Sequence, residues 1–211
     1  MELIRGAHNL RPRHRGTVAT IGNFDGLHLG HQAVLGQLAE KAAELGLPTT
    51  VISFEPLPRE YFLGDKAPPR LQRFRDKFLA MRRFSVDRLL CLRFDRGLAE
   101  QEASDFVEEL LVEQLGVKYL VVGDDFRFGR KRIGDFELLR TLGQRHGFYV
   151  AHMHSFQVEG ARVSSTRIRE ALAAGDMDTA QKLLGRPYRL NGRVAHGDKR
   201  GRTIGFPTAN L

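Results

Sequence analysis

The sequence predicts an α/β fold built on a parallel sheet, because short β-branched runs alternate with segments of helical periodicity and glycine-rich turns follow the strands. Residues 17–21 are apolar and β-branched, as in a buried strand, and residues 32–45 carry apolar side chains at helical spacing. Such alternation favours parallel strands with helices on both faces. It also favours a ligand site at the carboxyl ends of the strands.

The same reading continues along the chain. Strands are expected at 17–21, 49–54, 88–93, 119–122 and 148–153, and helices at 32–45, 71–84, 102–115, 136–146 and 164–174. The four most informative loops, 22–31, 54–62, 123–132 and 164–169, then all follow strands or open helices at one edge of the sheet. From residue 185 the composition changes, and residues 188–194 are expected to form the first strand of a second domain.

The composition is that of a folded globular protein, with 211 residues, 42% hydrophobic content and 14 phenylalanines. No run reaches the roughly 18 apolar residues of a membrane span, and residues 1–15 lack the apolar core of a signal peptide. We therefore expect a cytoplasmic protein without a membrane partner. The single cysteine, Cys91, lies in an apolar run and is expected to be a reduced, packed thiol.

The net charge of +8 favours anionic partners, since 33 basic residues face 25 acidic ones and arginine suits phosphate. Genomic bias toward arginine explains the surface charge equally well. A nucleic-acid-binding module is a weaker alternative that rests on the basic tract 127–132, which could also be a solvated loop. The chain carries no RNP, KH or helix-turn-helix signature, so we expect no nucleic-acid partner.

The turn after the first strand has the composition of a phosphate-binding loop. Its sequence is Gly22-Asn23-Phe24-Asp25-Gly26, followed by His28-Leu29-Gly30-His31. Free N–H groups and the positive end of the helix dipole favour anions there, and two imidazoles add donors. Taken alone, two histidines three residues apart are also compatible with a helix surface, and a zinc site is less favoured for want of further ligands at suitable spacing. Neither a dinucleotide-binding fingerprint nor a Walker A motif is present in this turn.

A second phosphate clamp is indicated near the end of the domain. Residues Ser164-Ser165-Thr166-Arg167-Ile168-Arg169 open a helix, so hydroxyls can cap its first turn while arginines face an anion. The alternative for this segment is an ordinary N-cap with solvated arginines.

The two clamps occur in the order typical of the nucleotidyltransferase superfamily. With residues 22–26, Phe54-Glu55-Pro56, the run 123–129 and Gly185-Arg186-Pro187-Tyr188, the chain resembles the prokaryotic bifunctional riboflavin kinase/FMN adenylyltransferase family, over residues 17–211. The resemblance implies a Rossmann-like nucleotidyltransferase fold. It also implies transfer of the AMP part of ATP to FMN, which gives FAD and pyrophosphate with the help of Mg²⁺.

The resemblance also implies roles for individual residues. Catalytic roles fall on His28, His31, Asn23 and Arg167, and ATP binding on Gly22, Asn23, Phe24, Asp25, His28, His31, Ser164, Thr166, Arg167 and Arg169. Flavin binding falls on Phe54, Pro56, Pro58, Phe62, Asp125 and Phe128, although phenylalanines at strand ends also serve as core. One departure is Leu57, where the family usually has histidine, which puts the local geometry of the flavin or nucleotide in doubt.

The tail resembles the start of a riboflavin kinase domain, which places the domain boundary between 1–184 and 185–211. Thr208 and Asn210, in a Pro-Thr-Ala-Asn motif, would hold magnesium and an ATP phosphate there. A kinase barrel needs several more strands, so we expect no kinase activity from residues 185–211. Nucleotidyltransferases acting on pantetheine phosphate or glycerol phosphate are the nearest enzyme alternatives. Self-association is left open.

Overall fold

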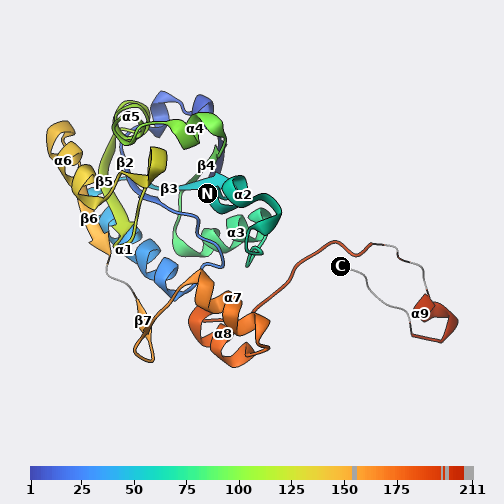
Figure 1. Ribbon diagram of the computed structural model, residues 1–211. Helices are drawn as coiled ribbons and strands as arrows, with labels where there is room; N and C mark the ends of the chain where they lie inside the picture. The colour runs from blue at the N-terminus through green and yellow to red at the C-terminus, as the bar shows by residue number, and fades with distance from the viewer. Residues whose placement is uncertain (154–155, 196, 198–199, 207–211) are drawn as a thin grey trace.

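Six parallel strands form the central sheet in the order β1-β4-β3-β2-β5-β6. The computed structural model describes residues 1–153, 156–195, 197 and 200–206 (Figure 1). The strands are β1 (Glu2–Arg5), β2 (Thr17–Ile21), β3 (Thr49–Glu55), β4 (Arg88–Arg93), β5 (Val117–Gly123) and β6 (Tyr149–Met153). The chain proceeds from β2 to β3 on one side and reaches β5 on the other. The direction of winding therefore changes between β2 and β5, which is where open α/β sheets bind ligands.

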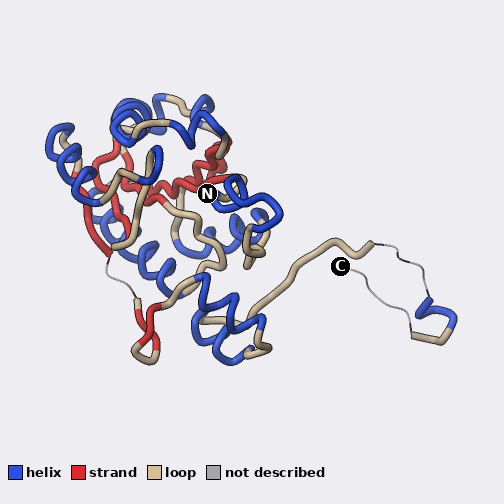
Figure 2. Tube along the Cα trace, in the orientation of Figure 1, coloured by secondary structure: helices blue, strands red, loops and turns tan. Residues whose placement is uncertain are grey.

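Helices cover both faces of the sheet (Figures 1 and 2). Helices α1 (Leu29–Leu45) and α3 (Phe74–Met81) bury one core, and the π-helix η5 (Phe106–Gln114) and α6 (Phe136–His146) bury another on the opposite face. Neighbours Leu89 and Leu90 in β4 are both fully buried, one in each core. Successive strand side chains point to opposite faces, so a strand covered on both faces is apolar throughout.

The elements expected between residues 17 and 174 are confirmed, with differences at their ends. Strand β4 and helix α6 have the expected bounds, whereas the helix expected at 102–115 divides into α5 (Ala103–Asp105) and η5. The helix expected at 71–84 is shorter, as α3 followed by the 3-10 turn η4 (Arg82–Phe84). Not anticipated were β1, α2 (Pro58–Leu63), α4 (Arg96–Glu100), α8 (Met177–Leu184) and the hairpin β7 (Gln157–Val158)–β8 (Ala161–Arg162). The strands and the helices α2 and α4 are too short to show a clear periodicity, whereas the amphipathic helix α8 was overlooked.

Two helices close the carboxyl edge of the sheet. Helix α7 (Ser165–Ala173) packs on α8, and Ile168, Leu183 and Leu184 form a third apolar cluster with Leu71. This cluster holds α7 beside the loop that follows β2 (Figure 1).

The strand expected at 188–194 is not formed, so that prediction was wrong. Residues 187–194 have no regular secondary structure, and Leu190 and Val194 are 74% and 61% exposed. A strand needs a hydrogen-bonded neighbour, and within the described residues these eight positions have none. The chain after α8 leaves the folded body as a loop that leads to a short helix, α9 (Arg200–Thr203) (Figure 2). Thr208 and Asn210 lie outside the described residues.

Two smaller expectations can be compared with the structure. Cys91 is buried, and burial raises the pKa of its thiol, as expected for a packed residue. In the part of the chain that is described, the helices are too short or too polar to cross a membrane.

Candidate functional site

A cavity of about 780 Å³ opens at the carboxyl ends of the strands. It is lined by residues from the loops after β2, β3 and β5, from β8 and from the start of α7. Of the expected site residues, the following line it: Gly22, Asn23, Phe24, Asp25, His28, His31, Phe54, Pro58, Phe62, Asp125, Phe128, Ser164, Thr166 and Arg169. The fold thus brings both expected clamps and the expected flavin slot into one cleft.

His28 and His31 form one unit at the start of α1. His28 is the N-cap, and its Nδ1 accepts the backbone N–H of His31 at 3.3 Å. The two rings stack with 3.6 Å between centroids and 13° between planes, and His31 also lies 5.0 Å from the ring of Phe24. Because Nδ1 of His28 accepts a hydrogen bond, the proton of the neutral ring lies on Nε2, where it can be donated to a ligand.

Both imidazoles are neutral at physiological pH. Burial, with a smaller contribution from the positive charge of Arg162, lowers the pKa of His28 to about 4. Burial likewise lowers the pKa of His31 well below its ordinary value, with smaller contributions from His28 and Lys77. Nδ1 of His31 is buried and has no hydrogen-bond partner among the described residues. The pair can therefore offer N–H donors without bringing two repelling charges together.

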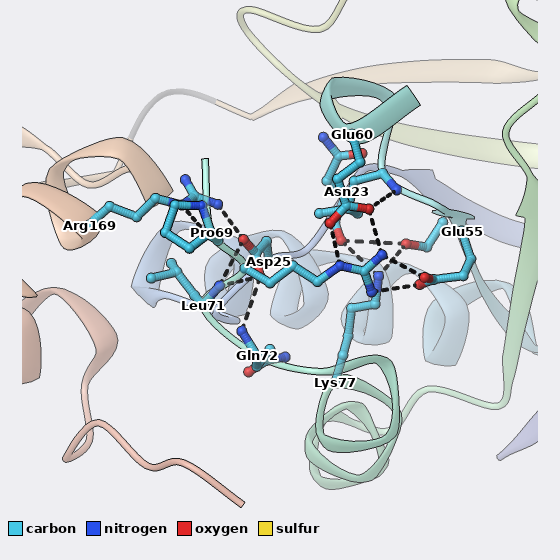
Figure 3. Close-up of polar contacts among 12 residues, drawn as sticks. Asn23, Asp25, Glu55, Glu60, Pro69, Leu71, Gln72, Lys77 and Arg169 are labelled. Carbon is cyan, nitrogen blue, oxygen red and sulfur yellow. Dashed lines mark hydrogen bonds and ion pairs between the residues drawn. The ribbon is translucent and has the colours of Figure 1, made fainter. Parts of the chain in front are cut away.

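Asp25 lines the cleft, and its carboxylate also connects three segments of the chain (Figure 3). Its carboxylate, 5% exposed, accepts the backbone N–H groups of Leu71 at 3.1 Å and Gln72 at 3.3 Å and forms an ion pair with Arg169. Arg169 also donates to Pro69 O at 2.6 Å, so both expected ATP ligands are engaged with the protein. We therefore assign Asp25 and Arg169 to fixing the loop after β2 against α7.

A buried lysine fixes the other end of this loop. Lys77, on α3 and 4% exposed, donates from Nζ to Asn23 O at 3.1 Å and to Ser53 Oγ at 2.9 Å (Figure 3). Burial lowers its pKa. Sequence reasoning missed Lys77, because a lysine within a helical pattern has the appearance of a surface charge. The Asn23 side chain, in contrast, lines the cleft.

The start of α7 follows the expected pattern in part. Ser164 is the N-cap, with Oγ accepting the N–H of Arg167 at 3.2 Å, and Ser165 Oγ donates to Asp25 O at 2.9 Å. The side chain of Arg167 does not line the cleft. Its guanidinium donates to Ala161 O at 3.3 Å and so holds the β7–β8 hairpin. The helix periodicity explains this difference, since Arg167 lies two positions from Arg169 and faces another side of α7.

A second arginine, which the sequence analysis missed, supplies positive charge to the cleft. Arg162 on β8 lines the cavity and forms an ion pair with Asp125 at 2.7 Å. Asp125 was expected to contact flavin. Four further cations that line the cleft are Arg59, Arg127, Lys131 and Arg132. Because both histidines are neutral, these arginine and lysine side chains provide the positive charge that attracts an anionic ligand.

The aromatic slot is larger than expected. Phe62 is 66% exposed and lies 5.7 Å from Phe94, and Phe128 is buried and stacks on Phe126 at 5.5 Å. Phe94, Phe106 and Phe126 line the cleft without having been anticipated. Pro56, which follows a cis peptide bond, does not line it.

Leu57, expected to depart from the family pattern, lies at the N-terminus of α2. Its side chain is 8% exposed and lines the cleft, and its N–H donates to Glu60 Oε2 at 2.8 Å. Arg70 pairs with Glu60 and, at 2.6 Å, with Glu55, so α2 is tied to the end of β3. This arrangement places Phe62 at the mouth of the cleft on a short, well-anchored helix.

Comparison with known proteins points to the same chemistry. The FAD synthetase family matches residues 10–167, and the riboflavin kinase family matches residues 184–211. The bifunctional riboflavin kinase/FMN adenylyltransferases of Pseudomonas fluorescens and Haemophilus influenzae are each 54% identical over 211 residues, and that of Escherichia coli K12 is 51% identical over 212 residues. Each match covers 100% of this chain and 68% of the relative.

A solved structure has the same fold. The crystal structure of a protein described as a macrolide-efflux protein from Streptococcus pneumoniae superposes with a TM-score of 0.86 at 30% identity, covering 100% of this chain and 69% of that one. Sequence motifs, cleft geometry and relatives agree, and the chain belongs to the FAD synthetase family of FMN adenylyltransferases.

Proposed function

We propose that the cleft performs adenylyl transfer with the ATP triphosphate held between the His28–His31 pair and the start of α7. A phosphate oxygen of FMN attacks the α-phosphorus of ATP, the bond from that phosphorus to the bridging oxygen breaks, and pyrophosphate leaves. No covalent enzyme intermediate is required. Alignment of the two substrates and stabilisation of the developing charge account for the acceleration.

The observation that supports this proposal most directly is the stacked pair of neutral imidazoles at the N-terminus of α1. Free N–H groups and the helix dipole favour phosphate at that point, and the change of winding direction between β2 and β5 places it in the ligand-binding crevice. His28 Nε2 is available as a donor because Nδ1 is occupied by the N–H of His31. Donors aimed at charge that develops on the leaving pyrophosphate stabilise the transition state more than the ground state.

The flavin ring would occupy the aromatic slot. Phe54, Phe62 and Phe128 line one continuous cavity with His28, so a dinucleotide-sized ligand can extend from the slot to the phosphate corner. Aromatic side chains supply apolar contact area for a planar ring. Arg162 lies in the same cavity, beside Asp125, and would face the FMN phosphate.

Magnesium fits this cleft as an ion that is bound mainly by ATP. Mg²⁺ usually uses one or two carboxylates together with substrate phosphates and water. Asp124 and Asp125 line the cleft, and the described residues contain no cluster of three or more metal-binding side chains. We propose that these two aspartates lie nearest the ion, which would neutralise charge on the phosphates.

The domain assignment extends the proposal. Helix α8 ends at Leu184 with Gly185 as its C-cap, which supports a boundary between an adenylyltransferase domain, 1–184, and a riboflavin kinase segment, 185–211. The roles of Thr208 and Asn210 in magnesium and phosphate binding stay predictions, as do a cytoplasmic location and self-association.

The basic tract gives no support to a nucleic-acid site. Arg130 pairs with Glu102 at 3.1 Å and Arg127 approaches Asp135 at 3.8 Å, while Lys131 and Arg132 line the cleft. These side chains are better explained as the rim of an anion-binding cavity.

The direct test is chromatographic detection of FAD after the protein is mixed with ATP, Mg²⁺ and FMN, with pantetheine phosphate replacing FMN in a parallel sample. We expect FAD from FMN and no adenylated product from pantetheine phosphate. Adenylation of pantetheine phosphate without FAD formation would contradict the assignment of the slot to flavin.

A further inference from the structure

Arg186 connects the segment after α8 to the phosphate-binding loop. It belongs to the Gly185-Arg186-Pro187-Tyr188 motif, and its NH2 group donates to Gly26 O at 2.9 Å and to Gln72 Oε1 at 3.3 Å. We propose that Arg186 is a positioning residue for adenylyl transfer, which fixes the loop after β2 for ATP; this rests on the proposed role of that loop. A residue matched by the riboflavin kinase family would thereby act in the adenylyltransferase site.

The backbone at Gly26 explains why a donor is needed. Gly26 is buried and has a φ of 86°, and a Cβ there would lie 2.7 Å from Leu71 Cδ1, so only glycine fits. Its carbonyl precedes His28 by two residues and lies outside any helix. A buried carbonyl without a partner is costly, and Arg186 supplies the partner.

The contact is part of a closed network. The backbone N–H of Gln72 donates to Asp25 Oδ1 at 3.3 Å, while its side-chain oxygen accepts from Arg186. Asp25 and Gly26 are consecutive, so the network holds the loop at two adjacent residues (Figure 3 shows the Asp25–Gln72 part). Displacement of Arg186 would loosen both of these contacts.

A second connection runs beside the first. Gln32 Nε2, on the first turn of α1, donates to Leu27 O at 2.8 Å and to Leu184 O at 2.9 Å. Gln32 therefore links the end of α8 to the carbonyl of Leu27, and Arg186 donates directly to the neighbouring carbonyl of Gly26. The loop that precedes His28 is consequently fixed by two residues at the C-terminal end of α8 and just beyond it, Leu184 and Arg186.

The charge of Arg186 favours the same role. Within the described chain its guanidinium has neutral acceptors and forms no ion pair with a carboxylate. An unneutralised cation beside the loop raises the positive potential where the triphosphate would lie. Arg189, which is exposed three positions later, offers a matched control of equal charge.

The experiment compares Arg186→Gln with Arg189→Gln in the full chain. For Arg186→Gln we expect the Kd for ATP, measured by calorimetry, and the KM for ATP to rise about tenfold, the effect of losing a hydrogen bond to a charged donor. The KM for FMN should stay at the wild-type value. Arg186→Lys should recover part of the ATP affinity because it can still donate to Gly26, and Arg189→Gln should behave as wild type.

Amide hydrogen exchange gives a readout that does not depend on turnover. We expect faster exchange at residues 22–28 in Arg186→Gln, and a Gln72→Leu substitution should add little to it, since both act through one contact. Wild-type ATP affinity together with wild-type exchange in Arg186→Gln would overturn the inference. Failure of the proposed function would instead appear in the wild-type protein, as ATP binding without FAD formation.

Discussion

The imidazole rings of His28 and His31 stack at 3.6 Å, nearly parallel, at the N-terminus of α1. Two protonated rings at that distance would repel strongly, and burial already disfavours the charged forms. The site therefore receives its positive charge from arginine and lysine side chains and its hydrogen-bond donors from neutral histidines. This division of roles accounts for the pH behaviour, the loop contacts and the substrate binding that we predict.

Lowering the pH should destabilise the protein through His28. Its pKa is about 4 in the folded chain against an ordinary value of 6.5, so between those values the unfolded chain binds a proton that the folded chain does not. The free energy of unfolding keeps its full contribution from neutral His28 above pH 6.5. That contribution is lost as the pH falls toward 4, and the total loss is about 3 kcal/mol. Thermal unfolding without ATP at pH 7 and pH 4.5 checks this. Between pH 7 and pH 4.5, the His28→Asn protein should lose less of its stability than the wild-type protein loses. Equal losses in the two proteins would contradict the assigned pKa.

Removing the Lys77 charge should impair activity more than stability. Lys77→Met keeps the length of the chain and removes a costly buried cation, but Asn23 O loses its ammonium donor. We expect adenylyl transfer to fall about tenfold with little change in Tm. The control is Lys118→Met, at an exposed position on β5. Unchanged kcat/KM for ATP in Lys77→Met would show that the contact does not position the loop.

Breaking the Asp25–Arg169 pair at one end should cost more than removing both charges. Asp25→Asn leaves a cation facing neutral acceptors in a site where the two side chains are 6% and 17% exposed. Loss of one partner from a buried pair typically costs about 3–5 kcal/mol, whereas apolar replacement of both is tolerated better. In urea denaturation, the free energy of unfolding should therefore be lower for Asp25→Asn than for the double variant Asp25→Asn/Arg169→Met. The reverse order would mean that the pair is not a stabilising unit.

Two phenylalanines of the aromatic slot should respond differently to truncation. Phe62 is 66% exposed, so Phe62→Ala should raise the KM for FMN while the Tm stays close to wild type. Phe128 packs on Phe106 and Phe126, so Phe128→Ala should lower stability by about 3 kcal/mol. Kinetics with FMN and thermal melts separate these effects. A normal KM for FMN in Phe62→Ala would remove that residue from the flavin site.

Local patterns were enough to predict much of the fold and to single out the two motifs whose residues line the cleft. Helix α6 has clear helical periodicity and strand β4 is a continuous apolar run, and His28 and His31 lie three residues apart in a recognisable motif. Contacts between distant segments could not be predicted: Asp25 and Arg169 are 144 residues apart, and Lys77 reaches Asn23 across 54 residues. The strand expected at 188–194 failed for the same reason, since strand formation depends on a neighbour that a local pattern does not reveal.

The most direct test of the account is the rate of FAD formation by His28→Asn, compared with wild type and His28→Ala. Asparagine preserves a cap for α1 but lacks the imidazole donor, so the Tm should remain near the wild-type value. If neutral His28 donates to the phosphates, FAD formation should fall about 10²- to 10³-fold in both variants, as on removal of an oxyanion donor. Wild-type turnover in a folded His28→Asn protein would contradict the central claim, because the histidine would then serve only as a helix cap.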